Sequence, residues 1–220
     1  FWTPAYLKSV YGMDSTQAAF PLFILYLITL LSIIGGWLPT YFVEKKGMNP
    51  YEGRMRAMLI FAFFPLLTLV AQPLGHISFW VPIIIIGIAG AAHQAWSANI
   101  FTTVGDMFPK KAIATITGIG GLAGGLGSTL INKSSGVLFD YTRLKWSTID
   151  GQPLLEKFPK FATEPIPESF LKDLQDTGVV VFDGINTGYM IIFSICAVCY
   201  LTGWLVMKSL VPKYSPITDL

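Results

Sequence analysis

Four long stretches without a charged residue restrict how this 220-residue chain can fold more than any other feature. They cover residues 15–43, 57–105, 112–132 and 184–207. A bilayer core of about 30 Å is crossed by roughly 20 helical residues at 1.5 Å each. The shortest stretch has 21 residues, and the longest has 49, which is enough for two crossings. These lengths predict membrane-spanning helices.

The longest stretch is interrupted at residues 72–76, where Pro, Gly and polar residues predict a tight interfacial turn. A soluble bundle would need polar faces at the helical period, and the four isoleucines at 83–86 leave no such face. We therefore expect five complete spans, near residues 18–43, 57–74, 78–103, 112–135 and 185–208.

Composition agrees with a membrane protein. Only 13% of the residues are charged and 53% are hydrophobic, whereas a soluble domain carries about 25% charged residues. This balance excludes a disordered segment. A net charge of +2 without a dense basic block argues against a nucleic-acid partner. We expect an all-α polytopic membrane protein whose surroundings are the lipid bilayer.

The basic residues predict the orientation of the spans. If the C-terminus is cytoplasmic, the inner segments carry eight Lys and Arg residues, and the short outer segments carry only Lys8. A long outer loop at 136–184 adds five more, but long loops translocate largely regardless of charge. Residues 209–220 then form a cytoplasmic tail. Residues 1–10 are too short to span, and we interpret them as the outer end of a truncated helix.

A glycine-rich run lies within the fourth predicted span. It contains a G-x-G-x-x-A match at 118–123, but a dinucleotide site needs a preceding strand and an exposed helix N-terminus. Small residues four positions apart instead let helices approach closely or bend. We expect that role for Gly120, Gly121, Gly124 and Gly125.

The chain offers little for catalysis. Cys196 and Cys199 form a C-x-x-C pattern in the middle of a span, where they are more typical of apolar packing than of redox chemistry. With two histidines and no carboxylate cluster near them, a metal site is not expected. We predict no enzyme activity and no cofactor.

A polar run interrupts the third predicted span. At 100° per residue, His93, Gln94, Trp96 and Ser97 fall within an arc of about 160°, and Asn99 lies on the far side of Trp96. Polar groups at this depth can bind a sugar-sized ligand, with the indole available for stacking. They can equally form hydrogen bonds between helices. The pattern leaves both interpretations open.

Two further groups of polar residues lie at span ends. Asn132 and Lys133 close the fourth span, where Lys133 can snorkel to the interface or attract an anionic solute. Asp106, Lys110 and Lys111 lie in the turn between the third and fourth spans. Such a charged turn usually sets topology, and it can also latch a gate in a rocking transporter.

Several motifs together resemble the hexuronate transporters, in the anion:cation symporter branch of the major facilitator superfamily. The most specific is the run at 91–99, A-A-H-Q-A-W-S-A-N, followed by D-M-F-P at 106–109 and G-I-G-G at 118–121. Residues 35–38 with Lys45 and Lys46 are similar to that family's helix 8 and its cytoplasmic turn, and residues 2–6 resemble the end of helix 7.

The resemblance implies a fold of twelve helices in two six-helix halves. This chain would be the C-terminal half with helix 7 truncated, helices 8–11 within residues 18–135, and helix 12 at residues 185–208. It implies proton-coupled uptake of glucuronate-like or galacturonate-like sugar acids across a bacterial inner membrane by alternating access. The coupling ion would be H⁺, and the absent N-terminal half would be a partner.

Within that resemblance, the substrate would contact Gln94, Trp96 and Ser97, with His93 behind them, and Asn99 would tie its helix to a neighbour. A transporter of another organic anion, such as an aldonate, and a membrane receptor that does not transport remain as alternatives.

The chain departs from the superfamily in two places. The pattern G-x-x-x-D-[RK] is absent after Gly36, where Thr40 and Tyr41 stand at the last two positions. The long outer loop is also larger than expected, and within it we expect a short capped helix at residues 165–174, with Pro167 near its start.

Overall fold

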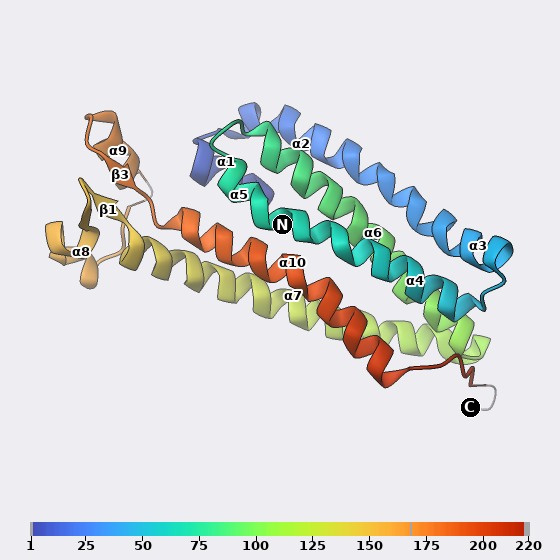
Figure 1. Cartoon of the computed structure of the whole chain (residues 1–220). Helices are drawn as coiled ribbons and strands as arrows, with labels where there is room; N and C mark the ends of the chain where they lie inside the picture. The colour runs from blue at the N-terminus through green and yellow to red at the C-terminus, as the bar shows by residue number, and fades with distance from the viewer. Residues whose placement is uncertain (1, 168, 218–220) are drawn as a thin grey trace. The chain divides into compact units, whose positions relative to one another are not determined.

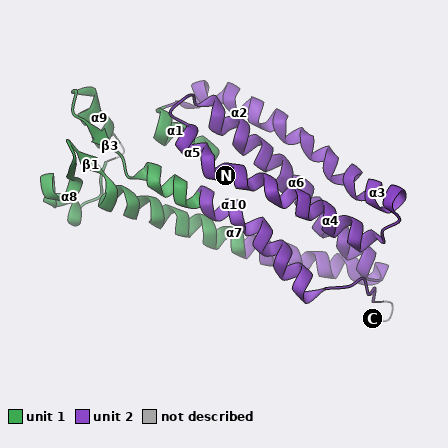
Figure 2. Ribbon diagram, in the orientation of Figure 1, with its two compact units in different colours: residues 1–12, 127–192 green, residues 13–126, 193–220 purple. Residues whose placement is uncertain are grey.

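A computed structural model describes residues 2–167 and 169–217, coloured from blue to red along the sequence in Figure 1. The chain is mostly α-helical and divides into two compact units (Figure 2). Unit 1 comprises residues 1–12 and 127–192, and unit 2 comprises residues 13–126 and 193–220. The long helices α7 (Lys110–Trp146) and α10 (Ile185–Leu210) contribute residues to both units.

Within the described residues, five helical segments are long and apolar enough to cross a membrane, as the sequence predicts. Large apolar side chains on these segments are exposed, among them Phe20 at 61%, Ile33 at 81% and Leu205 at 62%. A soluble bundle would bury such side chains, whereas lipid accommodates them. The expected class of an all-α polytopic membrane protein is confirmed. The segments are Ser15–Lys46, Pro50–Leu74, Trp80–Met107, Lys110–Trp146 and Ile185–Leu210.

The first segment begins and ends at clear capping signals. The Asp14 carboxylate accepts the Gln17 backbone N–H at 2.8 Å, and the Gln17 side chain accepts the Asp14 N–H at 3.0 Å, which forms a capping box. At the other end Gly47 adopts φ +65°, a left-handed conformation that glycine tolerates. The segment consists of α2 (Ser15–Thr29), η1 (Leu30–Ile33) and α3 (Ile34–Lys46).

The next two segments are separated by a turn at residues 75–79, a few residues later than the predicted 72–76, because residues 72–74 belong to a short helix. The Asn49 side chain accepts the Glu52 N–H at 2.9 Å, and Pro50 occupies the first helical position, where its missing N–H costs nothing. The second segment comprises α4 (Pro50–Phe63), η2 (Phe64–Val70) and α5 (Ala71–Leu74), and the third is α6 (Trp80–Met107).

Small residues bring the helices of unit 2 together. A Cβ added to Gly35 would lie 2.6 Å from both Cα and Cβ of Ala95, so α3 and α6 approach at backbone distance. A Cβ added to Gly87 would lie 3.1 Å from side-chain atoms of Ile28, which places α6 close to α2. This is the small-residue packing typical of membrane bundles.

In unit 1, α1 (Thr3–Tyr11) packs through aromatic rings. The Tyr6 ring meets the ring of Tyr189 edge-on at 5.0 Å, and Tyr189 lies 4.6 Å from the ring of Phe139. A Cβ added to Gly188 would lie 2.7 Å from Phe139 Cδ1, so the start of α10 lies against the end of α7. These contacts join α1, α7 and α10 within the unit.

The helix that contains the glycine-rich run is longer than the sequence predicts. The spacing predicts an end at residue 135 and a loop over 136–184, but α7 continues to Trp146. Its 37 residues measure about 55 Å, well beyond a bilayer core of about 30 Å. Ser135, at the predicted end, and Thr142, within the extension, are both buried in unit 1, so this part of the helix packs against protein. The loop prediction is therefore wrong over residues 136–146.

Residues 147–183, which we term the cap, are folded rather than a structureless loop. Three antiparallel strands lie in the order β2-β1-β3. Asp150 and Gly151, with φ of +52° and +78°, form the two-residue turn between β1 and β2, and an Asp-Gly pair suits such a hairpin. The strands are β1 (Thr148–Ile149), β2 (Gln152–Pro153) and β3 (Val181–Phe182).

The cap has its own apolar core. Ile149, Leu154, Phe161 and Leu171 are at most 3% exposed. An ion pair of 2.8 Å between Arg143 of α7 and Asp183, the last residue of the cap, joins the cap to that helix. The short helices are α8 (Leu154–Lys157), η3 (Pro159–Ala162) and α9 (Phe170–Asp176). The helix predicted at 165–174 thus begins at Phe170, and position 168 lies outside the described residues.

Candidate substrate-binding site

The polar run of the sequence lies on the middle of α6. His93 and Gln94 are exposed, Trp96 and Ser97 are half-buried, and Asn99 is buried. Because this burial changes within two helical turns, the run presents one open polar face and one face turned into the core. His93, the 14th of the 28 residues of α6, lies at the centre of the helix.

His93 has a partner on α10 that sequence reasoning missed. The Tyr200 hydroxyl lies 2.5 Å from His93 Nδ1, and the two rings meet edge-on with centroids 5.9 Å apart. The Trp96 ring also meets the Tyr200 ring edge-on, at 5.5 Å. The available signal was a tyrosine in the middle of the apolar segment 185–210. Tyr200 thus gathers His93 and Trp96 into one cluster.

The Trp96 indole is embedded between helices. A Cβ added to Gly203 would lie 3.5 Å from Trp96 Cη2, so the ring lies flush against α10. The same ring packs on two buried clusters that include Met55 and Ala95. Its Nε1 is buried and has no hydrogen-bond partner among the described residues. An unmade hydrogen bond of this kind costs about 1–3 kcal/mol.

Asn99 points into the bundle rather than toward the open face. Its Nδ2 donates to the carbonyl oxygens of Gly35 and Ala95, both at 2.8 Å, and so links α6 to α3. Only 1% of the side chain is exposed. The contact lies where Gly35 lets the two backbones meet.

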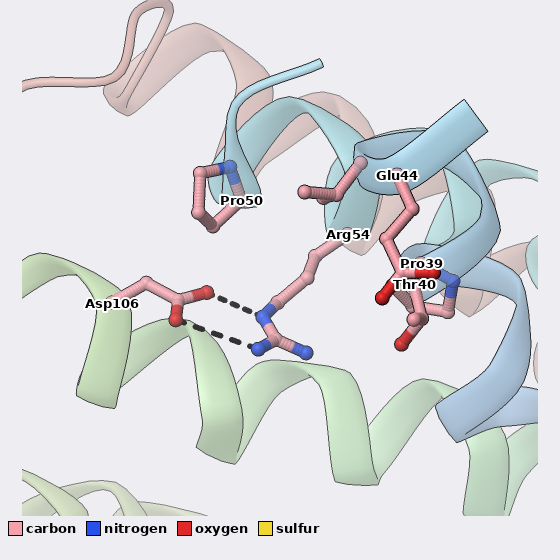
Figure 3. Close-up of a pocket in the computed structure, with 7 residues that line it drawn as sticks. Pro39, Thr40, Glu44, Pro50, Arg54 and Asp106 are labelled. Carbon is pink, nitrogen blue, oxygen red and sulfur yellow. Dashed lines mark hydrogen bonds and ion pairs between the residues drawn. The ribbon is translucent and has the colours of Figure 1, made fainter. Parts of the chain in front are cut away.

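A second polar group lies where α6 ends and α4 begins. Arg54 and Asp106 form a two-pronged ion pair, with Arg54 Nε donating to one carboxylate oxygen and Nη2 lying 3.4 Å from the other (Figure 3). Asp106 is close to Lys110 and Lys111 in the sequence, but both lysines are exposed and the ion-pair partner of Asp106 is Arg54. The pair borders a cavity of about 220 Å³ lined by Pro39, Thr40, Val43, Glu44, Pro50, Arg54 and Asp106.

The last turns of α10 and the residues that follow it lie along this same end of unit 2. The Tyr51 hydroxyl donates to the Val211 carbonyl, and Trp204 Nε1 donates to the Met55 carbonyl at 2.8 Å. Further on, the Ile217 N–H donates to the Met107 carbonyl at 2.8 Å. Through these bonds the end of α10 and the tail contact α4 and α6 up to the last described residue.

The remaining predicted residues make few contacts. Asn132 and Lys133 are exposed, and Asn132 Nδ2 lies 3.4 Å from Ser128 Oγ. Within the described chain, a Cβ added to Gly120, Gly121 or Gly124 would meet no atom within 4 Å, and the same holds at Gly125. There is therefore room for a partner at Gly120, Gly121 and Gly124, and a packing role for these three needs a partner other than the described residues.

In the part of the chain that the structure describes, neither the thiols nor the carboxylates gather into a metal site. Cys196 and Cys199 are free. Between residues 2 and 217, leaving out residue 168, no three His, Cys, Asp or Glu side chains lie together in a way that could hold a metal ion.

Comparison with known proteins identifies relatives. The chain is 25% identical over 189 residues to the hexuronate transporter of Escherichia coli (strain K12), which covers 76% of this chain and 42% of that protein. The chain is thus similar to a hexuronate transporter. It is also 27% identical over 146 residues to the uncharacterized transporter YybO of Bacillus subtilis (strain 168), covering 64% of this chain and 32% of that protein. No family model matches the chain, and no solved structure matches it significantly.

The relatives agree with the resemblance drawn from the sequence motifs. The chain spans less than half the length of the curated transporters it matches, which is consistent with one half of a major facilitator superfamily fold. Five candidate spans, together with relatives that are named transporters, indicate a multi-pass membrane protein.

Proposed function

We propose that this chain is the C-terminal half of a secondary active transporter that takes up hexuronates such as glucuronate or galacturonate by proton symport. The observation that carries the proposal is the open polar face of His93 and Gln94 at the centre of α6, in a relative of hexuronate transporters. Polar groups at mid-span are costly unless they serve a ligand or a partner. No enzymatic role or cofactor is proposed.

In this proposal the substrate lies against the open face of α6. Gln94 offers an amide donor and acceptor for sugar hydroxyls, and Ser97 lies on the same arc. Trp96 is half-buried, so it shapes the site through its contact with Tyr200. Asn99 maintains the spacing of α6 and α3 behind the site. Asn132 and Lys133 belong to the route by which an anion would approach.

Alternating access requires parts that open and close. The ion pair between Arg54 and Asp106 is suited to a latch, because two charges in contact can separate at modest cost where water reaches them. The open glycine face of α7 is suited to slide along the N-terminal half. Lys110 and Lys111 then mark the cytoplasmic side, the C-terminus is cytoplasmic, and the membrane is the bacterial inner membrane.

The test compares two α6 variants of the full-length transporter, meaning this chain joined to its N-terminal half. Gln94→Ala removes an exposed polar side chain, and Thr102→Ala removes a hydroxyl that bonds only within α6, to Ala98 and Asn99. Uptake of labelled glucuronate should fall at least tenfold in Gln94→Ala and stay near wild type in Thr102→Ala. Equal uptake in both variants would contradict the site.

Two alternatives use the same site. If the substrate is another organic anion, such as an aldonate, that anion should compete better than glucuronate against labelled uptake. If the protein is a receptor, sealed vesicles should bind the anion without accumulating it. The transporter names of the relatives favour transport.

A further inference from the structure

Resting on the proposed function, we propose that His93, oriented by Tyr200, is a proton-dependent binding group for the carboxylate of the substrate. The observations behind it are the hydrogen bond between His93 Nδ1 and the Tyr200 hydroxyl, the open position of His93, and the distribution of charge along the spans.

The spans leave few groups that could meet an anion. The four uncharged stretches contain no Lys, Arg, Asp or Glu. Of the two histidines in the sequence, His76 lies in the turn between α5 and α6, and its Nδ1 lies 2.6 Å from the Pro73 carbonyl oxygen. His93 is therefore the one side chain at the centre of a span that can gain a positive charge by binding a proton.

The hydrogen bond to Tyr200 leaves the imidazole of His93 able to donate from Nε2 in both of its protonation states. When the ring is neutral, the Tyr200 hydroxyl can donate to Nδ1, which leaves the proton on Nε2. When the ring is protonated, Nδ1–H donates to the same oxygen, and Nε2 again carries a proton. In either state Nε2–H is left for a ligand, while the positive charge is present only after a proton has bound.

Proton and anion would then bind together. A carboxylate oxygen that accepts Nε2–H is held more strongly by imidazolium than by imidazole, because the hydrogen bond becomes charge-assisted. By linkage, the anion raises the affinity for the proton by the same factor. When one carboxylate binds, the imidazole of His93 takes up one proton from solution. When the carboxylate is released, the imidazole returns that proton to solution, so the cycle needs no other reactant.

The groups around His93 do not supply this charge in its place. Tyr200 is the titratable group in contact with it, and the free thiols Cys196 and Cys199 lie on the same helix as Tyr200. The helices packed on α6 carry Tyr26, Tyr41 and Tyr51 and have their charged residues near their ends. Among the described residues, Tyr200 is a hydrogen-bond partner of His93, and none of the tyrosines or charged residues on those other helices is one.

The experiment measures binding of labelled glucuronate to the purified full-length transporter between about pH 5.5 and pH 8.5, across the range where an imidazole loses its charge. The wild type should lose about tenfold or more in affinity as the pH rises, the scale of one charge-assisted hydrogen bond. His93→Gln keeps an amide donor that does not titrate, so its affinity should not change with pH. His76→Gln, at the turn, is the matched control and should follow the wild type.

Tyr200→Phe removes only the hydroxyl and keeps the ring. It therefore separates the orientation of His93 by the hydrogen bond from the packing of the Tyr200 ring against it. It should retain a pH dependence, with its midpoint displaced and the affinity at low pH reduced several-fold. A His93→Gln variant with the pH slope of the wild type would overturn the inference while leaving transport of glucuronate intact. A wild type that binds no glucuronate at any pH would overturn the proposed function as well.

Discussion

The contact between Gly35 and Ala95 offers a sharp test of how α3 and α6 are held together. Gly35→Ala would place a methyl carbon 2.6 Å from two carbon atoms of Ala95, whereas carbon atoms pack at about 3.5–4.0 Å. The helices must therefore move apart by about 1 Å. Gly36→Ala is the matched control, because a Cβ there meets no described atom within 4 Å.

The expected cost has two parts. Overpacking a well-packed site costs about 1–3 kcal/mol. Separating the helices also weakens the hydrogen bond from Asn99 to the Gly35 carbonyl, worth about 0.5–1.5 kcal/mol. The sum is a loss of about 1.5–4.5 kcal/mol in the free energy of unfolding. Gly36→Ala should instead gain up to about 1 kcal/mol, because alanine favours the helix.

The assay is the thermal unfolding midpoint of the detergent-solubilised protein. At about 2–4 °C per kcal/mol for a chain of this size, Gly35→Ala should lower the midpoint by about 3–18 °C. Gly36→Ala should leave it unchanged or slightly raised. A midpoint for Gly35→Ala equal to or above that of Gly36→Ala would refute the close approach of the two helices.

Three further predictions concern the latch, the cap and the isolated chain. Arg54→Gln or Asp106→Asn should each slow glucuronate uptake by the full-length transporter at least severalfold. The double variant Arg54→Asp with Asp106→Arg, which exchanges the two charges, should recover part of the lost uptake. No recovery in the double variant would argue against a direct ion pair. The hydrogen bond from Lys157, and then the one from the Val180 N–H, lower the pKa of Asp150 in the folded cap. These two bonds therefore stabilise the cap fully above pH of about 4. Their contribution is lost as the pH falls through the lowered pKa of Asp150 in the folded state. Hydrogen exchange at β1 should accordingly increase on acidification below pH of about 4 in the wild type, and Lys157→Gln should shift that increase to higher pH; identical profiles would exclude the pair. The 220-residue chain by itself should show no proton-coupled uptake in vesicles, because the substrate site of such transporters lies between two halves.

The sequence was most informative where structure is local. Uncharged stretches longer than 20 residues predicted five spans, since length and apolarity alone decide whether a helix can cross a bilayer. The polar face of α6 also followed from helical geometry, because residues 93, 94 and 97 share an arc. The Asp150-Gly151 pair was a readable hairpin signal within the segment that we expected to be a loop.

Contacts between residues that are far apart along the chain could not be predicted from the sequence. His93 and Tyr200 are 107 residues apart, and Arg54 and Asp106 are 52 apart. No local period links such positions, and only packing of the helices brings them together. The extension of α7 to Trp146 was missed for a related reason, because burial of Ser135 and Thr142 depends on contacts within unit 1.

The central claim is that this chain forms half of a proton-coupled hexuronate transporter. Its most direct test is accumulation of labelled glucuronate by vesicles that contain the full-length protein, with an inward proton gradient imposed across the membrane. The account predicts accumulation above equilibrium that disappears when a protonophore collapses the gradient. Absence of accumulation, or accumulation unaffected by the protonophore, would contradict it.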